Sequence, residues 1–272
     1  MVIISVVRDF EMYDRLVRNN PFNQGATFYA IDNREKNEGV PVGYNSFLNQ
    51  YDYSKGDWFV FCHEDWEIQE SWFSKIESLA PTDIYGPVGT VMLGARKIVL
   101  GSISNSRKDG TGLRTVGIPC KTGTEVGTFD CQCLIVHSSI FCKWGLRFDE
   151  NLPFDLYAED FCINAFENYR LASRIVSLKC RHYSFGSIQP RFFDGATYIR
   201  RKYPNLSRCY STSVENIVWL PLKRGRFLGI PLGYKAILLL RFCYLSKVTA
   251  SGYWIIKICK IPVYRKRVVF DQ

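Results

Sequence analysis

The chain has 272 residues and a formal net charge of +9. Hydrophobic residues make up 47% of it and charged residues 22%, ordinary values for a globular protein with a substantial core, which exclude a disordered chain. Residues 1–189 contain 19 Lys and Arg against 23 Asp and Glu, for a charge of −4, whereas residues 190–272 contain 16 against 3, for +13. This asymmetry indicates a polyanionic partner, either an anionic membrane surface or a nucleic acid.

Strands and helices alternate in the first third of the chain. Apolar and β-branched runs predict strands at residues 2–7, 26–32, 57–62 and 83–92. Helical spacing predicts helices at 11–20, 44–51 and 70–80, the last with an apolar face. This alternation predicts an α/β fold with a mostly parallel sheet and helices on both of its faces.

The middle of the chain changes character. Two apolar runs at 95–104 and 114–119 flank a turn-rich segment, which predicts an inserted hairpin. A strand at 128–137 and a short helix that stops at Gly145 follow. A further helix at 158–170 and a last strand at 174–186 complete the unit.

The basic region beyond residue 189 has a different pattern. A basic helix is expected at 196–205, and the rest is rich in Leu, Ile and aromatic residues punctuated by single cations such as Lys235, Arg241 and Lys260. No stretch reaches the roughly 18 uncharged residues that a membrane span needs. We expect amphipathic helices here, which either lie in an anionic membrane interface or pack on the first domain.

The ten cysteines indicate a reducing compartment. Many of them, including Cys62, Cys133 and Cys162, lie in apolar runs, where a free thiol behaves as a small hydrophobic side chain. The apolar run at the N-terminus is too short for a secretory signal. We therefore expect a cytoplasmic protein, peripheral at the cytoplasmic face of a membrane if its basic region binds there.

Charged side chains follow several of the predicted strands. Asp9 and Asp32 each lie just after or at the end of a strand, and His63, Glu64 and Asp65 come directly after the third strand. In sheets of this kind ligands bind outside the carboxyl ends of the strands. Asp65 there would suit Mg²⁺ or Mn²⁺, with His63 two residues earlier on the same face, although a solvated acidic turn explains the same residues.

Several segments together resemble the family-2 glycosyltransferases of the GT-A fold. The stretch "GDWFVFCHED" is similar to the strand that carries the Asp-x-Asp motif of that family, with His63-Glu64-Asp65 in its place. The segments "GVPVGYNSFLNQ", "LRFDENLPFDLYAEDFCINAFENYR" and "CRHYSFG" match in order, and the resemblance spans about residues 2–186. It implies a GT-A-type sheet, to which the composition beyond residue 189 adds a basic amphipathic helical extension.

The resemblance also implies roles for individual residues. It implies that Asp160 is the general base, with Glu159 beside it, and that a divalent cation, Mn²⁺ or Mg²⁺, is held by Asp65, His182 and His63. It implies that the nucleotide-sugar donor is bound by Arg8, Asp9, Asp32, Asn45, Glu64 and Asp65. The histidine in place of the first aspartate of the motif leaves the metal dependence open.

The sequence therefore predicts an inverting glycosyltransferase. Residues 1–189 would form the catalytic domain and residues 190–272 the basic extension. The enzyme would move a sugar from a nucleotide diphosphate donor, expected to be a UDP-sugar, to a glycan or lipid-linked glycan acceptor in cell-surface polysaccharide biosynthesis. The alternatives are a nucleotidyltransferase and a non-catalytic protein that binds glycans or nucleic acid; the long aliphatic stretches between the cations favour lipid over nucleic acid.

Overall fold

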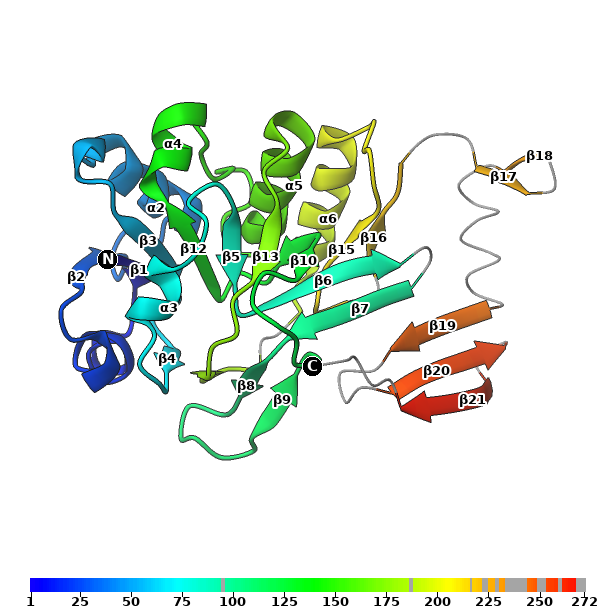
Figure 1. Ribbon diagram of the computed structural model, residues 1–272, viewed down its shortest axis with the longest axis horizontal. Helices are drawn as coiled ribbons and strands as arrows, with labels where there is room; N and C mark the ends of the chain where they lie inside the picture. The colour runs from blue at the N-terminus through cyan, green and yellow to red at the C-terminus, as the bar shows by residue number, and fades with distance from the viewer. Residues whose placement is uncertain are drawn as a thin grey trace.

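The fold is described from a computed structural model (Figure 1). It describes residues 1–93, 96–185, 188–215, 217–221, 225–227, 230–232, 244–248, 253–258 and 261–267. Side chains are described as far as residue 221.

A seven-stranded sheet forms the centre of the protein. Its order is β10-β13-β5-β12-β3-β1-β2, and five of the strands run in one direction while β12 and β10 run against them. The prediction of a mostly parallel α/β sheet is confirmed. The strands are β1 (Val2–Val7), β2 (Thr27–Asp32), β3 (Trp58–Cys62), β5 (Ile84–Gly86), β10 (Glu125–Val126), β12 (Cys133–His137) and β13 (Ser173–Ile175).

Helices cover both faces of this sheet, because successive residues of its buried strands point to opposite sides. Phe59 and Phe61 of β3 pack in one core with the helices drawn above the sheet in Figure 1, and Val60 packs in the other core with Trp72 and Ile76. The first set comprises α2 (Val40–Gln50), α4 (Ser138–Trp144), α5 (Tyr157–Tyr169) and α6 (Pro190–Lys202). The opposite face carries α1 (Phe10–Tyr13), which continues as the π-helix η1 (Asp14–Arg18), and α3 (Phe73–Glu77). Two 3₁₀ turns, Pro21–Asn23 and Tyr53–Lys55, complete the helical elements described.

Three predicted strands each divide between two sheets. Residues 83–92 form β5 and β6 (Val88–Leu93), which are separated at Pro87 because proline has no N–H group for the sheet ladder. Residues 128–137 likewise divide into β11 (Thr128–Phe129) and β12, and residues 174–186 into β13 and β14 (Cys180–His182). At each break the chain passes between the central sheet and one of two smaller sheets, β11-β6-β7 and β4-β14-β8-β9.

The inserted hairpin is confirmed and builds one side of the site. The strand β7 (Arg96–Gly101) pairs with β6, and β8 (Ile103–Asn105) pairs antiparallel with β9 (Arg114–Val116). A short strand that sequence patterns did not indicate, β4 (Trp66–Ile68), pairs with β14. This β4–β14 pairing brings His182 next to the segment that follows β3.

The region beyond residue 189 differs from the expected helices. The basic helix is present as α6, which begins just after the expected domain boundary at residue 189. Even so, α6 and Trp219 pack in the same core as α5, which precedes that boundary. The strands β15 (Tyr210–Ser211), β16 (Val218–Trp219), β17 (Gly225–Phe227) and β18 (Ile230–Leu232) follow. A three-stranded sheet then comprises β19 (Tyr244–Val248), β20 (Tyr253–Ile258) and β21 (Ile261–Arg267).

The helical prediction for residues 244–248, 253–258 and 261–267 is therefore wrong. These segments are dominated by β-branched and aromatic residues, which favour a pleated sheet over a helix. Pro262 lies on the edge strand β21, where proline is tolerated. The predicted interfacial cations Lys235, Arg241 and Lys260 lie outside the described residues, and no helix in the described part has the length and apolar character to cross a membrane.

Candidate active site

A cavity of about 1280 Å³ opens at the carboxyl ends of β1 and β3. One wall comes from the ends of these strands, a second from the β8–β9 hairpin and β14, and a third from the first turn of α5. The chain enters α5 through Leu156, which has a φ of +65°, a left-handed conformation uncommon for a branched residue. The polar residues of the lining are Arg8, Asn33, Tyr44, His63, Glu64, Asp65, Lys97, Asn105, Arg114, Asp130, Gln132, Asp155, Glu159, His182, Ser184, Arg191, Ser213 and Glu215.

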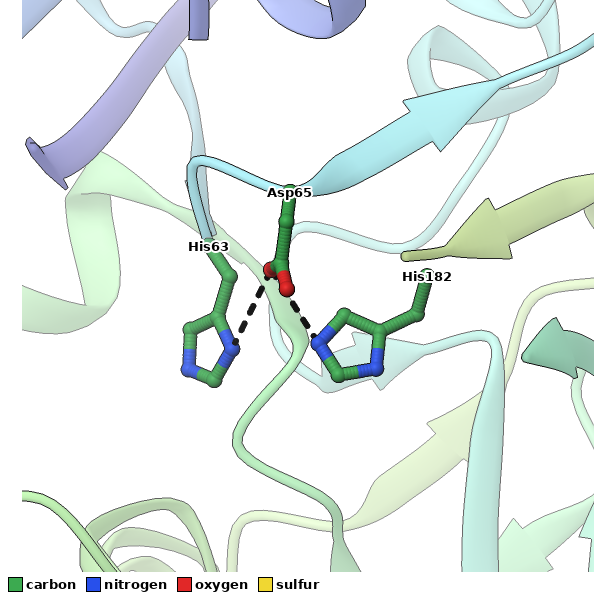
Figure 2. Close-up of side chains that lie close together, drawn as sticks. All are labelled: His63, Asp65 and His182. Carbon is green, nitrogen blue, oxygen red and sulfur yellow. Dashed lines mark ion pairs between the residues drawn. The ribbon is translucent and has the colours of Figure 1, made fainter. Parts of the chain in front are cut away.

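The three predicted metal ligands meet in this cavity. The carboxylate of Asp65 lies between the two imidazole rings (Figure 2), 3.1 Å from Nε2 of His182 and 3.9 Å from Nδ1 of His63. The three potential ligand atoms lie within 4.8 Å of one another. The predicted grouping of His63, Asp65 and His182 is therefore present, and the β4–β14 pairing brings it about.

A buried hydroxyl fixes the orientation of His63. The Tyr157 hydroxyl donates a hydrogen bond to the backbone carbonyl of Cys131 at 2.9 Å, and Nε2 of His63 lies 2.9 Å from the same oxygen. Because that hydroxyl has a single proton, Nε2 of His63 must donate to it. The lone pair of His63 is then on Nδ1, the nitrogen that faces Asp65.

The charge states of the cluster suit a cation. Burial lowers the pKa of His63, which leaves its imidazole neutral near pH 7. Burial opposes the ionisation of Asp65, but the charge and hydrogen bond of His182 outweigh it and lower the pKa of Asp65 to about 2. Burial also opposes protonation of His182, yet Asp65 raises the pKa of this histidine, so binding a cation through Nε2 would release a proton.

The donor set fits a divalent transition metal. Two imidazole nitrogens and one carboxylate oxygen suit Mn²⁺ and the later first-row metals. Mg²⁺ prefers an all-oxygen octahedral shell, which His63 and His182 do not supply. Of the two cations predicted, these residues therefore fit Mn²⁺ better than Mg²⁺.

Glu159 is a further buried carboxyl group in the cavity lining. It lies in the first turn of α5 and is 2% exposed, and the Cys131 thiol donates a hydrogen bond to its Oε2 at 3.6 Å. Burial and the negative charge of Asp130 raise the pKa of Glu159 to about 8. A carboxyl group that titrates near physiological pH inside a cavity is a candidate general acid or base.

Asp160 lies elsewhere, in contrast to the role predicted for it. It is 1% exposed and is not part of the cavity lining. Both of its carboxylate oxygens accept hydrogen bonds from the Lys202 ammonium, at 2.8 and 2.9 Å, and Asp149 completes the network at 2.6 Å from the same group. Successive helical positions point in different directions, so only Glu159 of this pair faces the cavity, and Asp160 joins α5 to α6.

The residues predicted to bind the donor fall into two groups. Arg8, Glu64 and Asp65 line the cavity, and the Glu64 carboxylate accepts hydrogen bonds from the backbone N–H groups of Arg8 and Asp9, which fixes the turn after β1. Asp9 is not part of the lining: it caps α1 through the Met12 N–H at 3.0 Å. Its predicted donor contact stays a prediction.

Asp32 and Asn45 also lie outside the cavity lining. Asp32 is exposed at the end of β2 and forms an ion pair with Arg34, whose hydrogen bond lowers the pKa of Asp32. The Asn45 amide oxygen accepts a hydrogen bond from the N–H group of Phe148 at 3.0 Å and its NH₂ group donates to the Phe148 carbonyl oxygen at 2.9 Å, which holds α2 to the loop between α4 and α5. The donor contacts of Asp32 and Asn45 stay predictions.

Sequence reasoning missed several polar residues of this lining, and Asp130 and Gln132 are two of them. Asp130 and Gln132 line the cavity between β11 and β12, and Ser213 donates a hydrogen bond to Asp130 at 2.8 Å. The sequence placed both residues inside one continuous strand, where they would not gather at a strand end. The available signal was "FDCQC", a polar interruption of an apolar run.

No protein-family model and no curated protein sequence matches the chain. Among solved structures, it is similar to GalNAc-T7 with UDP, GalNAc and Mn²⁺, at 10% identity and a TM-score of 0.43 over 66% of this chain and 43% of that one. TarS 1–349 from S. aureus has 13% identity and a TM-score of 0.45 over 76% and 65%. A glycosyltransferase involved in glycosylation of the major capsid of PBCV-1 has 11% identity and a TM-score of 0.31 over 71% and 97%.

The chain spans less than two thirds of GalNAc-T7 and of TarS. These similarities concern overall shape, and at such identities and TM-scores they carry no argument about activity. The resemblance to family-2 glycosyltransferases stays a prediction, and the function rests on the site.

Proposed function

We propose that the protein is a metal-dependent, inverting glycosyltransferase. It takes a sugar from a nucleotide diphosphate donor, UDP-linked in our proposal, and transfers it to a hydroxyl group of an acceptor glycan. One observation carries the proposal: the cluster of His63, Asp65 and His182 and the carboxyl group of Glu159 open into one cavity at the carboxyl end of the sheet.

The donor would bind between the cluster and the turn after β1. A divalent cation held by His63, Asp65 and His182 supplies positive charge for the departing nucleotide diphosphate. Arg8 lies in the same lining, and Glu64 holds its backbone in place. Arg8 would add a fixed positive charge beside the diphosphate.

Glu159 is our candidate for the general base. Inversion in a single displacement needs one carboxylate to take the proton of the acceptor hydroxyl as that oxygen attacks the anomeric carbon. With a pKa of about 8, Glu159 holds that proton far better than an ordinary carboxylate does. We expect the transfer rate to rise with pH up to about 8 and then to level off.

Two matched variants test this assignment. Glu159→Gln should abolish transfer and retain donor binding, because the amide keeps the size of the side chain but accepts no proton. Asp160→Asn should retain transfer and lose thermal stability, because Asp160 faces Lys202 and is not part of the cavity lining. The opposite result, transfer lost in Asp160→Asn and kept in Glu159→Gln, would return the base role to Asp160.

A thermal-shift titration tests the donor site itself. At a UDP concentration 100-fold above its dissociation constant, binding with Mn²⁺ adds about 2.7 kcal/mol and raises Tm by roughly 6 °C. Mg²⁺ in place of Mn²⁺ should give a smaller rise in Tm, and the Asp65→Ala variant should show no rise with either cation. Asp14→Ala is the matched control, because its carboxylate pairs with Arg18 on the surface of η1. An equal shift in wild type and Asp65→Ala contradicts the proposal.

Product analysis separates this function from the alternatives. A glycosyltransferase releases UDP from a UDP-sugar, a nucleotidyltransferase releases pyrophosphate from a nucleoside triphosphate, and a binding protein releases neither. Transfer assays with neutral and anionic glycans, free and lipid-linked, would identify the acceptor and show whether the enzyme serves cell-surface polysaccharide synthesis.

We also propose a cytoplasmic location with peripheral contact to anionic membranes. The charge of +13 over residues 190–272 supports the membrane contact, and the eight cysteines within the described residues, all of them free thiols, support a reducing compartment. Salt-sensitive sedimentation with vesicles that contain phosphatidylserine, and absence of binding to oligonucleotides, is the expected result. Binding to oligonucleotides alone would favour a nucleic-acid partner.

A further inference from the structure

One row of residues extends from the metal-binding cluster across the small sheet β4-β14-β8-β9. In its register His182 of β14 lies beside Asn105 of β8, and Asn105 lies opposite Arg114 of β9. Side chains paired in this way project from the same face of a sheet. All three residues line the cavity.

The alternate row points away from the cavity. Ser104 and Thr115 are paired across the same two strands, and their hydroxyl oxygens lie 3.5 Å apart. Neither residue is part of the cavity lining. The hairpin thus presents one polar row to the cavity and keeps the other on its outer side.

Two groups of the cavity row lack partners within the described part of the chain. Oδ1 of Asn105 is buried and accepts no hydrogen bond there. Arg114 is exposed and has no carboxylate of the described residues within ion-pair distance. A buried acceptor needs a hydroxyl or N–H donor, and an arginine in a cavity favours a carboxylate or a phosphate.

An aromatic side chain borders the same hairpin. Phe185 lines the cavity and is 49% exposed, and a Cβ atom on Gly112 would lie 3.4 Å from its ring. Phe185 therefore lies against Gly112 of the hairpin loop, and Gly112 precedes Arg114 by two residues. An exposed aromatic ring beside polar groups suits the apolar face of a sugar ring.

We propose that Asn105 and Arg114 form an acceptor subsite for a sugar that carries a carboxylate or a phosphate. Asn105 accepts a hydrogen bond from a hydroxyl group of this sugar, and Arg114 binds its anionic group. Neighbouring strands are about 4.8 Å apart, which puts the backbone of Arg114 about 10 Å from that of His182. This separation leaves room for a donor sugar between the diphosphate and the anionic group, and the inference rests on the proposed function.

The test uses the full-length protein saturated with Mn²⁺ and UDP. Glucose 6-phosphate is the probe and glucose its neutral counterpart, and paramagnetic relaxation by the bound Mn²⁺ reports binding to the protein. We expect glucose 6-phosphate to bind at least 5-fold more tightly than glucose. Arg114→Gln should remove this preference, and Arg114→Lys should retain part of it. Asn105→Leu should weaken the binding of both sugars.

Thr115→Ala is the matched control, since its side chain lies in the outer row of the same strand. Three results would overturn the proposal: an unchanged preference in Arg114→Gln, inorganic phosphate binding as tightly as glucose 6-phosphate, or an equal loss in Thr115→Ala. If Arg114→Gln weakens the binding of UDP-glucuronate but not that of glucose 6-phosphate, Arg114 binds an anionic group of the donor. That result refutes the acceptor assignment.

The UDP thermal shift separates the two proposals. A wild-type protein without a UDP shift refutes the proposed function. A normal UDP shift with no preference for glucose 6-phosphate refutes the anionic subsite alone. Loss of the UDP shift in Arg114→Gln would move Arg114 into the donor site and would likewise refute the subsite.

Discussion

Removal of the Tyr157 hydroxyl tests how the cluster is oriented. In Tyr157→Phe the Nε2–H group of His63 loses its acceptor, and the imidazole can turn or take up its other tautomer, which withdraws Nδ1 from the cation. Loss of such an outer hydrogen bond typically lowers metal affinity 10- to 100-fold. That range corresponds to about 1.4–2.7 kcal/mol of binding free energy.

The assay is a titration of the protein with Mn²⁺, with free Mn²⁺ followed by electron paramagnetic resonance. The dissociation constant of Tyr157→Phe should rise 10- to 100-fold. Tyr53→Phe is the control, because that hydroxyl donates to the Leu48 carbonyl at 2.7 Å and Tyr53 is not part of the cavity lining. Equal Mn²⁺ affinity in wild type and Tyr157→Phe would refute the proposed tautomer of His63.

Three further predictions concern stability. In the folded state Glu159 keeps its proton up to a pKa of about 8, whereas in the unfolded state it loses the proton at the ordinary pKa of 4.5. Between these two pH values the folded state binds more protons, so the free energy of unfolding should fall by up to about 1.4 kcal/mol for each unit that the pH rises. Glu159→Gln should remove that decline in urea titrations, and an unchanged slope would contradict the raised pKa. Lys202→Met leaves Asp160 buried without its cation and should cost about 3 kcal/mol by urea denaturation; a loss below about 1 kcal/mol would contradict a stabilising ion pair. Gly101→Ala should cost at least about 2 kcal/mol by the same method, since its φ is +85° and a Cβ would lie 2.1 Å from the Pro87 carbonyl oxygen; wild-type stability would contradict that contact.

Local sequence patterns were sufficient for several strands of the central sheet and for helices that cover it. The β-branched run of β1, the apolar run of β3 and the helical spacing of α5 each reflect burial along one element, which is visible in a single sequence. The same patterns predicted that Asp9, Asp32 and the polar residues after β3 would gather at one sheet edge. His63, Glu64 and Asp65 line the cavity there, whereas Asp9 and Asp32 are not part of its lining.

Patterns in the sequence failed where the outcome depends on distant partners. The amphipathic composition of the last part of the chain led to a prediction of helices. The described segments between residues 244 and 267 are strands, which their β-branched residues favour. The breaks at Pro87 and between β11 and β12 depend on which sheet each half joins. A local pattern contains no information about that choice.

The sequence by itself determined the alternation of strands and helices and the residue types available for chemistry at the sheet edge. Only the tertiary structure decided which of these residues meet. The β4–β14 pairing, across more than a hundred residues, brings His182 to Asp65. The packing of α6 on α5 pairs Lys202 with Asp160, and the neighbouring Glu159 lines the cavity. Contacts of this kind depend on packing between elements far apart in the chain, which neighbouring residues do not specify.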